Sequence, residues 1–169
     1  MSTFDSAWGK VTDAIAIAVP MALTTAIPFA GPILSGALLT GVTINMCEEI
    51  VDVYGYRSLS GMSTFIGVIP GAAAGASIAN VVIGYIPGIG VVANCAATVL
   101  LHTVSGLIVI SICELYKDGT VSDEELKNNS MGIASAILGE LTGKVGDVLR
   151  GTPSDMKEAV KSIAKGKLN

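Results

Sequence analysis

The chain has 169 residues, of which 51% are hydrophobic and only 14% are charged, and its formal net charge is −4. This composition excludes intrinsic disorder, which requires few apolar residues and many charges. It also argues against nucleic-acid binding, because no chain-wide basic field is available to neutralise phosphates. An ordinary soluble domain carries about 25% charged residues, so this chain has too few charges for a surface of the usual kind.

Two long windows contain no Asp, Glu, Lys or Arg. They cover 14–47, which is 34 residues, and 58–113, which is 56 residues. Charge-free segments well beyond about 18 residues are typical of membrane-embedded chain, because the bilayer core does not solvate an ionised side chain. The alternative is a buried helix pair in a soluble protein, since many window residues are small rather than strongly apolar.

Proline and glycine mark two tight turns inside these windows, at 27–32 and at 86–90. They predict an all-α fold with two antiparallel hydrophobic helical hairpins. The expected helices cover about 3–26 and 32–55 in the first hairpin, and about 59–85 and 88–118 in the second.

The second helix of each hairpin has a similar ending. Cys47-Glu48 precedes Gly55, and Cys113-Glu114 precedes Gly119. We expect both glycines to cap their helices, because glycine readily adopts the positive φ that such caps require. The likeness is either a weak internal duplication or a coincidence in a Gly-rich chain. The cysteines are odd in number, so we expect no disulfide framework and a reducing, cytoplasm-facing environment.

Small and polar residues suggest how the helices would pack in lipid. A small residue recurs every fourth position at Gly67, Gly71, Gly75 and Ala79, which favours a close helix seam of the glycine-zipper kind. Asn80 and Asn94 lie seven residues on either side of Pro87, so they either bond across the hairpin or are satisfied by backbone groups. His102, the only histidine, has either a hydrogen-bonded packing role or a functional role as an intramembrane ionisable group.

All charged segments are expected at one end of the bundle. Trp8, Tyr54, Tyr56 and Tyr116 belong to that end, where aromatic rings form an interfacial belt. The second hairpin has uncharged stretches of 26 residues each, about 39 Å long, which can span an ~30 Å core. The first hairpin has only 14 and 15 such residues, about 21–23 Å, so it should dip into one leaflet and return.

The last third of the chain has a different character. Ser122 to Glu125 forms a capped helix start. The apolar face that follows is expected to pack on a partner or a second copy, and it consists of Ile133, Ile137, Leu141, Val145 and Val148. Residues 150–169 have a net charge of +3, and Lys157, Lys161 and Lys165 share a face that either contacts anionic lipid headgroups or is simply solvated. We therefore divide the chain into a membrane-embedded bundle, 1–119, and an amphipathic helical segment, 120–169.

Catalytic chemistry is not indicated. The chain has no Gly-Lys-Ser/Thr phosphate loop, and its G-x-G-x-x-A match at 88–93 lacks the acidic residue and the second strand–helix unit of a dinucleotide site. His102 has no Cys or carboxylate at ligand spacing. We expect no enzyme activity, no cofactor and no metal.

From Ile27-Pro28-Phe29-Ala30 through Tyr54-Gly55, and again around Ile86-Pro87-Gly88-Ile89-Gly90, the chain resembles a poorly characterised bacterial family. Hydrophobic helical domains of that family follow small GTPase domains or occur in inner-membrane proteins. The resemblance covers about residues 20–119. It implies membrane association and a GTPase partner, and it supplies no catalytic residues.

The leading hypothesis is a non-enzymatic integral membrane protein that self-assembles and scaffolds or shapes the membrane, with both termini on the cytoplasmic side of a bacterial inner membrane. Its expected partners are the lipid bilayer, further copies of the chain and a GTPase, but not nucleic acid. One alternative is an oligomeric pore lined by Asn80, Asn94 and His102. The other is a soluble helical shell or adaptor protein.

Overall fold

The computed structural model describes residues 2–23, 30–56 and 89–142, together with 155, 157, 158 and 160–162. The fold is all-α, as the sequence predicts. Its four described helices are α1 (Thr3–Ala22), α2 (Ala30–Tyr54), α4 (Ile89–Lys117) and α5 (Asp123–Thr142). The helix expected over 59–85 lies outside the described residues.

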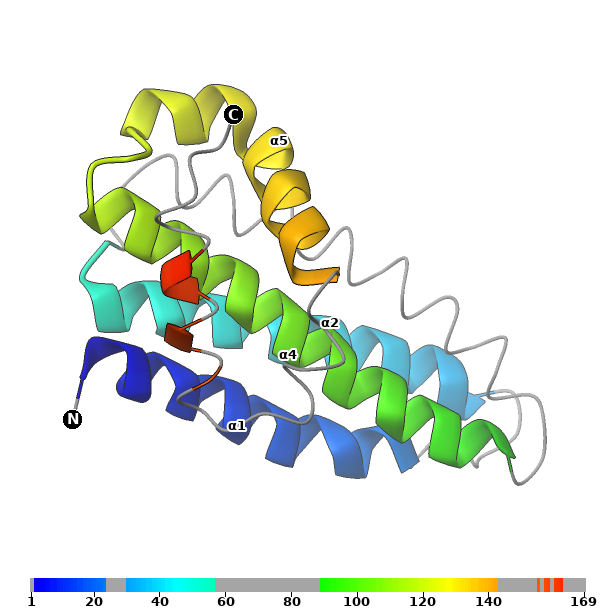
Figure 1. Ribbon diagram of the computed structural model, residues 1–169. Coiled ribbons are helices and arrows are strands. Elements are labelled where there is room, and N and C mark those ends of the chain that lie inside the picture. The colour runs from blue at the N-terminus through cyan, green and yellow to red at the C-terminus, as the bar shows by residue number, and fades with distance from the viewer. Residues whose placement is uncertain are drawn as a thin grey trace.

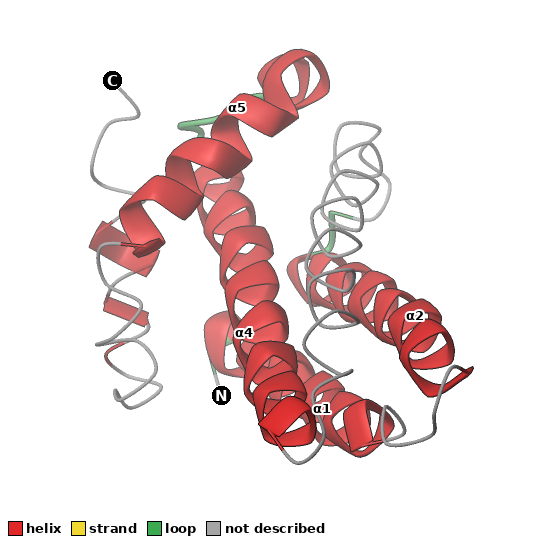
Figure 2. Cartoon of the chain, turned by 90° about the vertical axis from the view of Figure 1, so that its right-hand side faces the viewer, coloured by secondary structure: helices red, strands yellow, loops and turns green. Residues whose placement is uncertain are grey.

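Helices α1, α2 and α4 form a three-helix bundle, with α5 packed against α4 (Figures 1 and 2). Lys10 of α1 pairs with Glu49 of α2, so these two helices are antiparallel, as expected for the first hairpin. Along α2 and α4, Thr43 meets His102 and Tyr54 meets Glu114, so these two helices run parallel. The start of α1 therefore lies at the same end of the bundle as the C-termini of α2 and α4.

The two predicted glycine caps are present. Gly55 and Gly119 have φ values of +77° and +70°, a conformation that a side chain at either position would strain. The Tyr56 N–H then donates to the Val51 carbonyl at 3.1 Å, and the Thr120 N–H donates to the Leu115 carbonyl at 2.9 Å. Both bonds satisfy carbonyls of a last helical turn in the same way, so α2 and α4 share their endings in structure as well as in sequence.

A tight seam joins α1 to α4. The buried face of α1 begins with Phe4 and continues as a stripe of small side chains, which are Ala7, Val11, Ala14, Ala18 and Ala22. On α4, a Cβ added at Gly106 would overlap the Val11 side chain, so the two backbones approach closely here. Such small-residue seams stabilise helix pairs through van der Waals contact. The four-residue spacing predicts a seam of this kind at 67–79, outside the described residues, whereas the seam on α1 was not predicted.

Helix α5 begins with the predicted cap. The Glu125 N–H donates to Ser122 Oγ at 3.3 Å, and Glu125 Oε2 accepts from the Ser122 N–H at 2.8 Å. The helix bends at Asn129, whose φ of −141° and ψ of 31° are not helical.

The apolar face of α5 is covered by this chain itself, which corrects the expectation that a partner or a second copy covers it. Ile133, Ile137 and Leu141 are buried in the same hydrophobic core as α1, α2 and α4. Val160 of the C-terminal segment also belongs to that core. Segment 120–169 is thus joined to the bundle by a shared core, while Val145 and Val148 lie outside the described residues.

Candidate functional site

The bundle has two halves that differ in charge. We call residues 2–13, 45–54 and 106–117 the charged half, and residues 14–23, 30–44 and 89–105 the charge-free half, which contains no Asp, Glu, Lys or Arg. The three helices expose three large hydrophobic side chains among the described residues: Ile17 at 52%, Leu23 at 50% and Leu100 at 38%. All three belong to the charge-free half.

Two of these exposed side chains, Ile17 and Leu100, lie at comparable depth. Since Lys10 lies opposite Glu49, the antiparallel register places Ile17 opposite Val42. Val11 lies against Gly106, so the same register places Ile17 level with Leu100 on α4. The described part of the charge-free half therefore presents large apolar side chains outward from two helices at one level.

A groove runs between α1 and α2 across the boundary of the two halves. It has a volume of about 590 Å³. Its walls are formed by Lys10, Asp13, Ala14, Ile17 and Met21 of α1 and by Gly41, Val42, Asn45, Met46 and Glu49 of α2. A cleft of this size falls within the range of ordinary small-molecule sites.

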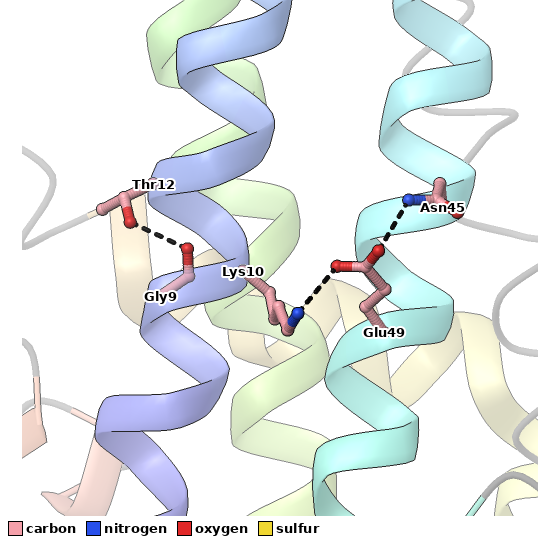
Figure 3. Close-up of polar contacts among 5 residues, drawn as sticks. All are labelled: Gly9, Lys10, Thr12, Asn45 and Glu49. Atoms are coloured by element: carbon pink, nitrogen blue, oxygen red, sulfur yellow. Dashed lines mark hydrogen bonds and ion pairs between the residues drawn. The ribbon is translucent and has the colours of Figure 1, made fainter. Parts of the chain in front are cut away.

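The polar end of this groove is a cross-helix network (Figure 3). Lys10 Nζ lies 3.3 Å from Glu49 Oε2, and Asn45 Nδ2 donates to Glu49 Oε1 at 3.0 Å. The Lys10 and Glu49 side chains are 38% and 41% exposed, so solvent screens the pair. The nearby Thr12 hydroxyl donates to the Gly9 carbonyl of its own helix and leaves the network unchanged. Sequence reasoning missed this network, because no local spacing pairs residues on two different helices.

His102 lies inside the bundle. It is fully buried, its Nδ1 lies 2.8 Å from the Thr98 carbonyl oxygen, and its Nε2 lies 3.3 Å from Thr43 Oγ1 on α2. Since a carbonyl only accepts, Nδ1 carries the proton, and in a neutral ring Nε2 is an acceptor. Thr43 Oγ1 is also 2.8 Å from the Leu39 carbonyl, so two acceptors compete for the Thr43 hydroxyl proton. His102 thus makes a polar contact between α4 and α2 within the charge-free half.

Three of the four aromatic residues predicted to be interfacial form a cluster at the far end of the charged half. The rings of Tyr54 and Tyr56 stack with centroids 6.1 Å apart, and those of Tyr56 and Tyr116 meet edge to face at 4.9 Å. Tyr54 Oη donates to Glu114 Oε1 at 2.7 Å. Burial, and next this hydrogen bond, raise the pKa of Tyr54 above its ordinary value. Trp8 lies separately on α1, half-buried against the core.

The tail lysines are placed against the start of α1. Lys157 and Lys161 line a cavity of about 380 Å³ together with Ser2, Glu114 and Lys117. Lys157 Nζ donates to Ser2 Oγ at 3.3 Å, and Lys161 pairs with Glu158 at 3.2 Å. Sequence reasoning did not foresee that the tail would return to this end of α1, because that contact joins residues 155 positions apart.

Several predicted residues lie where the structure says nothing of their side chains. Gly67, Gly71, Gly75, Ala79, Asn80 and Lys165 are outside the described residues, and Asn94 is described only as part of α4. The three cysteines are free, and burial raises the pKa of Cys47 to about 12, so it remains a neutral thiol. Across 2–23, 30–56 and 89–142, no group of three or more His, Cys, Asp or Glu side chains could hold a metal ion.

Within the described helices, only Cys95–Lys117 is long and apolar enough to cross a membrane, with a mean hydropathy of 2.1. Of its most apolar stretch, 61% is buried inside the chain, so α4 also serves as the central helix of the bundle. Comparison with protein-family models, curated proteins and solved structures found no match. The family resemblance seen in the sequence therefore stays a prediction.

Proposed function

We propose that this chain is a non-enzymatic, membrane-associated helical scaffold whose charge-free half enters lipid while its charged half remains in water. The observation that supports this most is the outward exposure of Ile17, Leu23 and Leu100 in the half without charges. In lipid such side chains are well solvated, whereas an ionised group there costs about 2.5–3.5 kcal/mol or more near the bilayer centre.

The lengths of the helices favour entry from one side. The charge-free part of α1 runs from residue 14 to its end at Ala22, which is about 13 Å of helix and less than half of an ~30 Å hydrocarbon core. We infer that α1 enters only one leaflet and that α2, whose charge-free part over 30–44 is about 22 Å long, enters from the same side, on the cytoplasmic face of a bacterial inner membrane. Asymmetric insertion expands that leaflet, so the protein would bend the membrane. Vesicles that stay spherical in electron micrographs after adding the protein would count against the shaping role.

We do not assign the two described tail lysines, Lys157 and Lys161, to the proposed lipid contact. Lys157 is bonded to Ser2, which lies twelve residues before Ala14, or about 18 Å along α1. This distance exceeds the Debye length of about 8 Å at physiological salt. Self-assembly and a GTPase partner remain proposals drawn from the sequence.

Partitioning into neutral phosphatidylcholine vesicles tests the proposal. The double variant Ile17→Glu/Leu100→Glu should lower the vesicle-bound fraction by roughly two orders of magnitude, since each charge costs at least about 1.4 kcal/mol in lipid. The matched control is Met131→Glu, because Met131 of α5 is 63% exposed but lies outside the charge-free half. The control should partition like the wild type.

A second candidate, a water-soluble helical adaptor, is supported by the 61% burial of the most apolar stretch of α4. It predicts a monodisperse wild-type protein without detergent and no binding to vesicles. A pore between copies has less support, because His102 faces α2 within the bundle and so would not line a lumen between neighbouring chains.

A further inference from the structure

The groove between α1 and α2 changes character with depth. Lys10 and Glu49 lie opposite each other at the end of the groove nearest the charged half, so this end of the groove is charged. Asp13 and Asn45 occupy the next level, and deeper in the charge-free half the walls are apolar, formed by Ile17, Gly41, Val42 and Met21. A cleft that is polar at the water side and apolar on the lipid side has the polarity of a single lipid molecule.

The dimensions also match one lipid chain. From Asp13 to Met21 the groove follows eight residues of helix, about 12 Å. One leaflet contributes about half of an ~30 Å hydrocarbon core. The apolar part of the groove, from Ala14 to Met21, is about 10 Å long and therefore covers roughly two thirds of the depth of one leaflet. The volume of about 590 Å³ holds one chain rather than a whole cluster of lipids.

The charged residues at the mouth of the groove limit which class of lipid headgroup can bind there. Among the described residues, the mouth offers one cation, Lys10, one amide, Asn45, and two carboxylates, Asp13 and Glu49. A phosphate fits the Lys10 and Asn45 donors, and a primary ammonium fits the two carboxylates. A purely anionic headgroup would meet a mouth with a net charge of −1.

A choline headgroup fits this mouth less well. Its quaternary ammonium has no N–H to donate to Asp13 or Glu49, and proteins usually hold it against aromatic rings. No aromatic residue is among the described residues that line the groove. The mouth therefore favours a zwitterionic headgroup with a primary amine.

We propose that this groove binds one phospholipid of the phosphatidylethanolamine class, with its phosphate at Lys10, its ammonium at Asp13 and Glu49, and one acyl chain along Ile17, Gly41 and Val42. This inference rests on the proposed membrane association. The half-exposed Lys10–Glu49 pair opens to admit the headgroup. One solvent-screened ion pair is then replaced by two pairs that are less exposed to water, one between the phosphate and Lys10 and one between the ammonium and the carboxylates.

The test begins with the full chain reconstituted into vesicles containing equal amounts of phosphatidylethanolamine, phosphatidylglycerol and phosphatidylcholine. The protein is extracted in mild detergent, and co-isolated lipids are counted by mass spectrometry. We expect about one phosphatidylethanolamine per chain, enriched about tenfold over each of the other two lipids.

Filling the groove should abolish retention of this lipid. A Cβ at Gly41 would meet no atom within 4 Å, so Gly41→Leu adds a side chain to open space and should fold normally. It should lower the co-isolated phosphatidylethanolamine about tenfold. Gly9→Leu is the matched control, because a Cβ at Gly9 also meets nothing within 4 Å and Gly9 does not line the groove.

Changing the charge of the mouth should change the preferred headgroup. Asp13→Asn/Glu49→Gln leaves Lys10 as the only charge, so phosphatidylglycerol should replace phosphatidylethanolamine as the enriched lipid. The control Glu48→Gln/Asp118→Asn makes the same change in net charge at two exposed positions outside the groove and should keep the original preference.

The outcomes separate the two proposals. A protein that does not associate with vesicles overturns both membrane association and the lipid site. A protein that does associate, but retains equal lipid in Gly41→Leu and in wild type or shows no headgroup preference, overturns the lipid site alone.

Discussion

The two halves of one three-helix bundle follow different rules of construction. In the charged half, polar side chains face outward, and large apolar ones such as Met46, Ile50 and Leu107 are fully buried. In the charge-free half, the buried stripe of α1 is mostly alanine, while Ile17 and Leu23 face outward. Water drives large side chains inward in the charged half. Under the proposed membrane association that driving force is absent from the charge-free half, where small residues at the helix contacts are sufficient.

The buried core and the proposed lipid-binding groove lie in different parts of the bundle. The described hydrophobic core, which includes residues of α5 and Val160, gathers around the C-terminal half of α4. The groove crosses the boundary between the halves, and the exposed side chains of Ile17, Leu23 and Leu100 lie in the charge-free half. We infer that the charged half holds the fold together and leaves the charge-free half available for lipid.

The largest effect is expected where packing is tightest. Gly106→Leu places a side chain against Val11 and should destabilise the protein by about 3 kcal/mol, measured by urea unfolding. Gly41→Leu, in open space, should be neutral or slightly stabilising, because glycine weakens a helix by about 1 kcal/mol. The milder Gly106→Ala should be partly rescued by Val11→Ala, since the second change removes the overlapping methyl groups. An equal loss of stability in Gly106→Leu and Gly41→Leu would contradict the proposed difference in packing between the two halves.

An intermediate effect is expected at the tip of the charged half. Tyr54→Phe removes the hydrogen bond to Glu114 and should cost about 1 kcal/mol at pH 7. The pKa of Tyr54 is raised in the fold, so its contribution is complete below the unfolded value of about 10 and is lost as pH rises beyond it. Wild type should therefore lose more stability than Tyr54→Phe between about pH 9 and pH 11.5, as followed by circular dichroism. Parallel curves for the two proteins would contradict this assignment.

The smallest effect is expected at the boundary between the halves. Lys10→Gln removes the half-exposed pair with Glu49 and should change the free energy of unfolding by about 0.5 kcal/mol or less, with the difference vanishing in high salt. Thermal unfolding of wild type and Lys10→Gln at low and high ionic strength measures this difference in stability. A loss of several kcal/mol would show that the pair is structural and is not free to open for a headgroup.

Much of the fold could be predicted from local pattern. The all-α class, the antiparallel first hairpin, the caps at Gly55 and Gly119 and the capped start of α5 depend on neighbours within a few residues or on simple turn chemistry. The alanine stripe of α1 was also present in the sequence, at three- and four-residue spacing. Because alanine contributes little hydropathy, the hydropathy pattern alone does not predict that this stripe is buried.

The groove could not be predicted in the same way. Lys10 and Glu49 are 39 residues apart, and only the packing angle and register of two helices bring them together. The same limit applies to the apolar face of α5, which the sequence marks clearly. The periodicity of apolar residues shows that one face of a helix must be buried, but it does not show whether the same chain or a partner covers that face.

The sequence by itself thus determined that half of this bundle carries no charge, because charge placement is written residue by residue. Only the tertiary structure decided which apolar side chains turn inward, which remain exposed, and where a cleft crosses the boundary. Those outcomes depend on how whole helices pack against one another, and close packing is a property of the assembled core rather than of any single segment.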